Sequence, residues 1–229
     1  MRASKELNSR LRGFAVATHF GPTVLVVTVS FCLALTQYSG FGSLEVACAI
    51  LMGQCVVGWS NDLVDLPLDT AAGRQNKPLV SGKIAPSELK RAITGALFLC
   101  FLLSYLGPLG VKGTGVHALG LLSATLYNLK LKNTWFSVLP YIFSFGALPW
   151  AIYLSAGKAP STWLVFGFIF FASAFHFLNV VKDLEWDLRQ GVNGLPQRLG
   201  KGRSIAIAVL LILAGVAVII FKWRLLLDK

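Results

Sequence analysis

Long apolar runs separated by short polar segments dominate this chain and limit the kind of fold that it can adopt. A transmembrane helix needs roughly 20 mainly apolar residues, and seven stretches approach that length. They are residues 14–37, 43–60, 89–107, 113–129, 135–156, 161–181 and 204–222. The runs are too long and alternate too little for barrel strands, and backbone inside a membrane must be hydrogen-bonded internally. The sequence therefore predicts an all-α fold, a multi-span transmembrane helical bundle.

The composition supports a membrane protein. The mean hydropathy is +0.67, and only 14% of the 229 residues are charged, which leaves too little polar surface to cover a soluble globule of this size. No polar linker is long enough to separate two modules. A single transmembrane domain over residues 1–229 is therefore expected.

The net charge of +11 is distributed unevenly among the predicted loops. If the N-terminus is cytoplasmic, sixteen of the twenty-one Lys and Arg residues fall in segments on the inner side. This is the positive-inside pattern of an integral, multi-pass protein. It places the two longest inside loops, residues 61–88 and 182–203, on the cytoplasmic face, and it argues against nucleic acid as a partner.

The first of these loops begins with a cluster of acidic residues. Asp62, Asp65 and Asp69 stand at i, i+3 and i+7, which places them on one face of a helix. Carboxylates with the amide oxygen of Asn61, and with no Cys or His, suit Mg²⁺, which typically joins one or two carboxylates to substrate phosphates. Pro67 is a candidate helix breaker, which would bring Asp69 in from a loop. The alternative interpretation of the cluster is a solvated turn at the membrane interface.

A second acidic cluster follows the sixth apolar run. Asp183 and Asp187 share a helical face at i and i+4, whereas Glu185 points roughly opposite. His176 and Asn179 extend this face back into the apolar run, and polar groups at membrane depth usually face a cavity or a partner. The stripe as a whole favours a cavity wall. His176 alone is equally consistent with a satisfied hydrogen bond between helices and with a ligand contact.

Cations lie close to both clusters. Arg74 and Lys77 follow the first cluster, and Lys182 and Arg198 flank the second. Carboxylates that hold Mg²⁺ beside Arg and Lys are what a diphosphate needs, because the metals bridge its oxygens and the cations neutralise the remaining charge. The same cations are also what a positive-inside topology requires, so both interpretations stay open.

Tyr127 and Lys130 lie between the clusters, at the end of the fourth run. At i and i+3 they are expected to share a helical face. An interfacial Tyr with a snorkelling Lys is ordinary membrane anchoring. The alternative is that Lys130 meets a diphosphate while the Tyr127 ring shields a developing carbocation.

With these motifs in place, the chain resembles the UbiA superfamily of intramembrane prenyltransferases. The resemblance lies in four segments: Asn-Asp-x-x-Asp-x-x-x-Asp at 61–69, Arg-x-x-Lys-Pro-Leu-x-Ser-Gly at 74–82, Tyr127 to Lys130, and Asn179 with Asp183, Asp187 and Arg198-Leu199-Gly200. It implies an all-α bundle in which two Mg²⁺ ions bind an isoprenyl diphosphate. Ionisation then yields an allylic cation that is attacked by a small acceptor, aromatic or lipid-like.

The resemblance also implies roles for individual residues. One Mg²⁺ would be held by Asn61, Asp62, Asp65 and Asp69, and the other by Asp183 and Asp187. The diphosphate would be held by Arg74, Lys77 and Lys130. The polar stripes and nearby cations add Asn61, His176, Asn179, Lys182 and Arg198 as candidate substrate-binding residues. The groups closest to the chemistry would be Asp65, Tyr127, Lys130 and Asp187.

Three features depart from the family pattern. Lys77 stands where the family usually has Arg, which keeps the charge but loses a bidentate fork. Val180 stands where many members have Asp. The family usually has two more spans than the seven predicted here, so the cavity would open sideways to membrane lipid, or a second subunit of a homo-oligomer would close it.

The leading functional hypothesis is a Mg²⁺-dependent transfer of an isoprenyl group within the membrane. A terpene cyclase would share the ionisation step and let the cation cyclise internally. A cation transporter is disfavoured, because the acidic residues lie at the ends of spans and not near the midplane. A non-catalytic or partner-dependent relative is the remaining alternative.

Overall fold

The computed structural model describes residues 2–227, and the side chains of residues 7–222. Every regular element in this part of the chain is a helix, which confirms the predicted all-α class. The chain divides into two compact units, one ending at Thr114 and the other beginning at Gly115. Each unit is described by itself, and the single domain stays a prediction.

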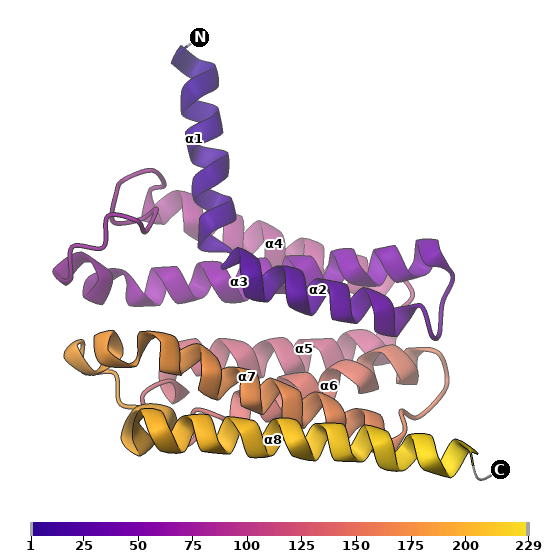
Figure 1. The fold of residues 1–229 in the computed structure, drawn as a ribbon. Coiled ribbons are helices and arrows are strands. Elements are labelled where there is room, and N and C mark those ends of the chain that lie inside the picture. The colour runs from indigo at the N-terminus through magenta and orange to yellow at the C-terminus, as the bar shows by residue number, and fades with distance from the viewer. Residues whose placement is uncertain (1, 228–229) are drawn as a thin grey trace. The chain divides into compact units, whose positions relative to one another are not determined.

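The first unit is built around one long helix. Its elements are α1 (Arg2–Ala17), α2 (Phe20–Ala34), α3 (Gly40–Ala71) and α4 (Pro86–Leu106). Helix α3 packs against both α2 and α4 (Figure 1). Helix α3 begins where the Ser39 hydroxyl accepts a hydrogen bond from the Gly42 amide, and α4 begins with Pro86, whose missing N–H costs nothing in the first turn.

The predicted first span, 14–37, is divided in two. Helix α1 ends at Ala17 and α2 begins at Phe20, with a bend of 68° between the two helical axes, so that α1 leaves the direction shared by α2, α3 and α4 (Figure 1). His19 lies at the bend in a left-handed conformation, with φ 56° and ψ 63°. This conformation is uncommon for a residue with a side chain.

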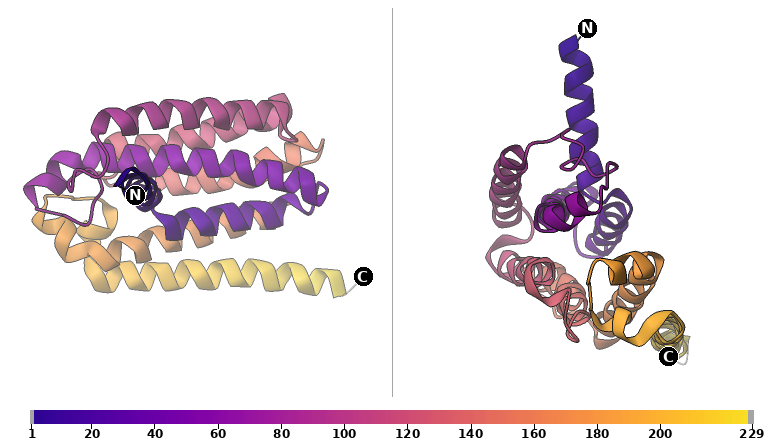
Figure 2. Two further views of the ribbon diagram at one scale, coloured as in Figure 1. Left: turned by 90° about the horizontal axis from the view of Figure 1, so that it is seen from above. Right: turned by 90° about the vertical axis from the view of Figure 1, so that its left-hand side faces the viewer.

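The second unit is built around α7. Helix α5 (Gly110–Leu126) begins just before the boundary and continues as a short π-helix, η1 (Tyr127–Leu131). The remaining helices are α6 (Leu139–Ser155), α7 (Thr162–Arg189) and α8 (Leu195–Leu227). Helix α7 packs against α6 and α8, and the course of α7 and α8 can be followed in Figure 2. Helix α8 contains a kink at Gly200, where φ is 78°.

Both acidic clusters lie on helices, which corrects the predicted loop boundaries. Pro67 does not end α3, which continues to Ala71, so Asp69 is helical and does not approach from a loop. Helix α7 likewise continues to Arg189. The connections that remain are 72–85 and 190–194. The apolar runs therefore predicted where α3 and α7 begin, but not how far these helices extend into the polar sequence that follows.

The helices are long and apolar enough for an integral membrane protein. Within residues 2–227, α3, α4, α7 and most of α8 meet the length and hydropathy of a membrane span, and a fifth span is added if the bent α1–α2 pair counts as one. The predicted number of seven is not confirmed, since α6 is a shorter apolar helix. Large apolar side chains are exposed along α4 and α8, as Phe98 and Leu210 illustrate, and lipid is the solvent that suits them.

Candidate active site

The acidic residues of the first cluster line one face at the end of α3. Asp62 and Asp69 are buried, with 3% and 5% of their surface exposed, and Asp65 is half-buried. The Asn61 side-chain amide donates a hydrogen bond to Asp65 Oδ2 at 3.1 Å. Two buried carboxylates about two turns apart on one helical face repel each other unless a cation lies between them.

Cations from the following connection supply that compensation. The Lys77 ammonium lies 2.6 Å from Asp62 Oδ1 and 4.0 Å from Asp69 Oδ2. The Arg74 guanidinium donates to Asp69 Oδ1 at 3.1 Å. The structure therefore brings together four of the predicted site residues and shows that a single positive group can reach both Asp62 and Asp69.

The connection 72–85 is held in place by packing. Leu79, Ile84 and Leu89 form a buried apolar cluster against α3. The Arg74 amide donates to the Asp69 carbonyl at 3.0 Å, and Gly82 takes a φ of 69° that ends the following turn. The two cations are thus positioned by a folded segment and not by a free loop.

His19 is a residue of this site that the sequence did not reveal. Its Nε2 lies 3.1 Å from Asp62 Oδ1, and in the Nε2–H tautomer it donates to that carboxylate. The bend that carries it lies directly on α3, because a Cβ on Gly58 would come within 2.8 Å of the Thr18 carbonyl oxygen. The Trp59 indole also donates to the Phe14 carbonyl at 3.2 Å. The left-handed backbone of His19 is therefore fixed by contacts with α3.

In the second unit, the predicted acidic residues lie on α7 with unequal environments. Asp183 is exposed and Asp187 is half-buried. Asp187 Oδ2 accepts a hydrogen bond from the side-chain amide of Gln197 at 2.9 Å, and Asn179 is half-buried one turn before Asp183. Gln197 was not anticipated, although it follows the second cluster closely in sequence.

An aromatic cluster surrounds His176. The ring centroids of Tyr127, Tyr141 and His176 lie 4.5 to 5.8 Å apart. His176 is 1% exposed, its Nε2 lies 3.3 Å from Ser137 Oγ, and its Nδ1 is buried with no hydrogen-bond partner among the side chains described. Because Ser137 Oγ accepts from the Leu195 amide at 3.0 Å, its own proton can go to Nε2. Nδ1 is then a buried donor, a group that a polar substrate atom could satisfy.

Three predicted binding cations of this unit do not meet its acidic residues at short range. Lys130 and Lys182 are exposed, and the Arg198 guanidinium lies 4.9 Å from the centroid of the Trp135 ring. The prediction that Tyr127 and Lys130 share a helical face is wrong, because the segment is a π-helix. Its wider turn rotates a residue three positions on away from the face that it would share in an α-helix.

Comparison with known proteins identifies the family. The sequence model of the UbiA prenyltransferase family matches residues 22–227, nearly the whole chain. The chain belongs to the UbiA prenyltransferase family. The resemblance drawn from the two acidic motifs is thereby confirmed at the level of the family.

Individual UbiA relatives agree with this assignment. The chain is 34% identical over 165 residues to the bacteriochlorophyll synthase 33 kDa chain of Cereibacter sphaeroides, and the match spans 66% of this chain and 53% of that protein. It thus matches about half the length of this relative. The fold is similar to that of a UbiA homologue from Archaeoglobus fulgidus bound to Cd²⁺, with a TM-score of 0.76, 14% identity, and coverage of 93% of this chain and 79% of the other.

A second structure of the Archaeoglobus fulgidus UbiA homologue is bound to GPP and Mg²⁺. It matches with a TM-score of 0.67 and 17% identity, over 98% of this chain and 76% of that one. At these identities, the two structures establish that this chain has the UbiA fold.

The residues at the end of α3 suit the Mg²⁺ expected of a UbiA protein. Within the described part of the chain, no group of three or more His, Cys, Asp or Glu side chains is placed to hold a metal ion by itself. That is compatible with Mg²⁺, which usually takes one or two carboxylates and completes its shell with water and substrate phosphates. The Lys77 ammonium, between Asp62 and Asp69, marks where a cation meets both carboxylates.

Proposed function

We propose that this UbiA protein transfers an isoprenyl group from an isoprenyl diphosphate to an acceptor inside the membrane, in a Mg²⁺-dependent reaction. The observation that carries the proposal is the shared cation position between the buried Asp62 and Asp69. A Mg²⁺ ion bound there supplies charge that favours departure of the diphosphate. The Archaeoglobus fulgidus homologue bound to GPP and Mg²⁺ supports the same substrate class.

In the first unit, each residue has a separate task. Asp62 and Asp69 would hold the Mg²⁺ ion, with Asn61 and Asp65 completing the polar face. Lys77 and Arg74, already beside these carboxylates, would pair with the diphosphate oxygens when a divalent ion occupies the carboxylates. His19 is a positioning residue, because its contact with Asp62 Oδ1 fixes the orientation of that carboxylate.

In the second unit, Asp183 and Asp187 would hold a second Mg²⁺, with Asp187 oriented by its hydrogen bond from Gln197. Lys130, Lys182 and Arg198 add positive charge for the diphosphate, and Asn179 adds an amide.

The aromatic residues of this unit protect the hydrocarbon. The rings of Tyr127 and Tyr141 stabilise an allylic cation through their faces. The unpaired Nδ1 of His176 donates to a polar atom of the acceptor. An apolar surrounding keeps water away from the cation.

The acceptor is a small aromatic or lipid-like molecule. Because one relative is a bacteriochlorophyll synthase chain, a bacteriochlorophyll precursor belongs among the acceptors to be offered. The aromatic cluster also suits a terpene cyclase, which would need no acceptor. A cyclic hydrocarbon formed from the diphosphate alone would favour the cyclase over the transferase.

The experiment that tests the proposal is product analysis by mass spectrometry. The purified protein in lipid vesicles is offered a panel of isoprenyl diphosphates, with and without acceptors and Mg²⁺. Asp62→Ala and Asp183→Ala should each abolish turnover without loss of membrane insertion. The matched control is Glu185→Ala, which removes an exposed carboxylate of the same helix as Asp183 and should leave turnover intact. Normal turnover in either aspartate variant would remove the two-metal proposal.

We also propose that the chain crosses the membrane seven times, with the N-terminus and both acidic segments on the cytoplasmic side. The positive charge of those segments supports this orientation. Labelling of single cysteines placed at 76 and 193, in intact and in permeabilised cells, tests it. Labelling in intact cells at either position would contradict a cytoplasmic location.

A further inference from the structure

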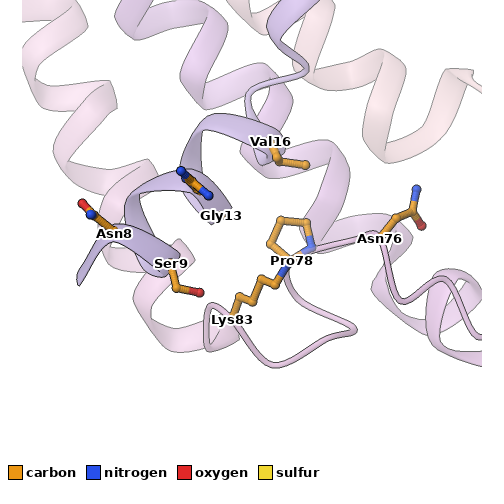
Figure 3. A pocket seen from close by; sticks show the side chains of 8 residues that line it. Asn8, Ser9, Gly13, Val16, Asn76, Pro78 and Lys83 are labelled. Carbon is orange, nitrogen blue, oxygen red and sulfur yellow. The ribbon is translucent and has the colours of Figure 1, made fainter. Parts of the chain in front are cut away.

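A polar pocket lies beside the active-site connection and is not explained by the proposed reaction. It is a half-open hollow of about 360 Å³, with one wall from α1 and the other from the connection 72–85. Figure 3 shows Ser9 and Val16 of α1 beside Pro78 and Lys83 of the connection. Its lining residues are Asn8, Ser9, Arg12, Gly13, Val16, Asn76, Pro78 and Lys83.

The pocket is a packed feature of the first unit. Gly13 is buried against Ile84, because a Cβ at position 13 would come within 3.0 Å of the Ile84 side chain. The Arg10 guanidinium and the Glu88 carboxylate form a salt bridge at 3.1 Å, and the Trp59–Phe14 hydrogen bond joins α1 to α3. These contacts hold α1 against the connection, so the distance between the two walls is fixed.

Both charged side chains that line the pocket are positive. Arg12 and Lys83 line it, and no carboxylate does. Over side chains 7–222, neither of these cations forms a salt bridge, and Glu88, in the first turn of α4, is already paired with Arg10. Asn8, Ser9 and Asn76 add neutral hydrogen-bonding groups. Such a set suits the oxygens of a phosphate group.

The pocket also lies beside one end of two helices that are long and apolar enough to span a membrane. It is bounded by the connection between α3 and α4, two helices long enough to span a bilayer, and a connection between spans is exposed to the headgroup region. Helix α1, bent away from α2, exposes Leu7, Leu11 and Val16, and an amphipathic helix at this position lies in the interface. Val16 is at once exposed and part of the lining, so apolar surface continues from the pocket toward lipid.

We propose that this pocket binds the phosphate of an anionic phospholipid, held by Arg12 and Lys83, with the acyl chains along α1. Lys77, on the same connection between Asn76 and Pro78, points instead to Asp62. The lipid site and the acidic face of α3 thus use different side chains of one segment. A bound lipid would also hold α1 and the connection together.

The test uses the full chain purified in detergent. Native mass spectrometry measures binding of dioctanoyl phosphatidylglycerol, dioctanoyl phosphatidylcholine and inorganic phosphate, each in a separate titration. The anionic lipid should bind about tenfold more tightly than phosphatidylcholine, because the choline ammonium cancels the charge of the phosphatidylcholine headgroup and is repelled by Arg12 and Lys83. Arg12→Gln with Lys83→Gln should remove this preference, whereas the matched pair Lys90→Gln with Arg91→Gln, on exposed positions of α4, should keep it.

Three results would overturn the proposal: no preference for the anionic lipid, an equal loss in both double variants, or inorganic phosphate that binds as tightly as the lipid. The last result would assign the pocket to free phosphate. Asn76→Asp provides an independent variant, since it places a negative charge at an exposed lining position. It should weaken binding of the anionic lipid and leave binding of phosphatidylcholine unchanged. An unaltered ratio of the two affinities would count against the site. None of these readouts depends on prenyl transfer.

Discussion

Replacing Lys77 by glutamine should raise the affinity of the protein for a divalent metal while it lowers turnover. The Lys77 ammonium lies 2.6 Å from Asp62 Oδ1 and within reach of Asp69, so a metal ion must displace it. Both groups are largely buried, with 14% of the Lys77 and 2% of the Asp62 side chain exposed. A hydrogen bond between charged groups contributes about 1.5–3 kcal/mol. Removal of this competitor should therefore tighten metal binding about tenfold to a hundredfold.

The assay is a titration of the detergent-purified protein with Mn²⁺, in which electron paramagnetic resonance measures the concentration of free Mn²⁺. Lys90→Gln, at an exposed lysine of α4, is the control and should bind Mn²⁺ like the wild type. Without metal, Lys77→Gln should unfold more easily by about 3 kcal/mol, because Asp62 loses its partner in a buried pair, and Mg²⁺ should restore the difference. A folded Lys77→Gln protein that binds Mn²⁺ no better than the wild type would refute the shared cation position.

Three further variants test other parts of the structure. His19→Gly keeps a residue that accepts a positive φ but removes the imidazole beside Asp62. Mn²⁺ binding and turnover should both fall several-fold, with little change in the unfolding temperature, and His19→Gln should recover part of the loss. Wild-type Mn²⁺ binding in His19→Gly would contradict the positioning role. Tyr141→Leu should lower turnover about tenfold through loss of a ring that faces the cation, whereas Tyr141→Phe should stay close to the wild type; equal activity of the two would exclude a role for the ring. Gly58→Ala should destabilise the protein by about 1–3 kcal/mol, because its Cβ would meet the Thr18 carbonyl at 2.8 Å, whereas Gly95→Ala, with open space around it, should be neutral or stabilising in thermal unfolding.

The helices could be predicted because their signal is local. The apolar runs near 43–60, 89–107 and 161–181 correspond to α3, α4 and α7, since a long apolar stretch in lipid can only be helical. The break at 18–19 could not be predicted from its own residues, because it depends on contact with Gly58, forty residues on. The π-helix at Tyr127 is equally hidden, since no residue type marks a widened turn.

The candidate site shows the same division. The spacing of Asp62 and Asp69 correctly placed them on one face, as their common contact with Lys77 confirms. His19 was missed because its partner lies 43 residues away in sequence. A signal was nonetheless available, since a histidine inside an apolar run is costly at membrane depth and usually has a functional partner. The roles of Lys130, Lys182 and Arg198 stay predictions.

The π-helix has a consequence for how the protein can diversify. Tyr127 and Lys130 stand three positions apart in sequence, and the π-helix directs them differently: the Tyr127 ring joins an aromatic cluster, and Lys130 is exposed. Deleting Leu131, which keeps Tyr127 and Lys130 three positions apart, would restore an ordinary α-helical turn and bring both side chains to one face. While the widened turn is retained, the ring in the aromatic cluster and the exposed charged position can be substituted independently of each other.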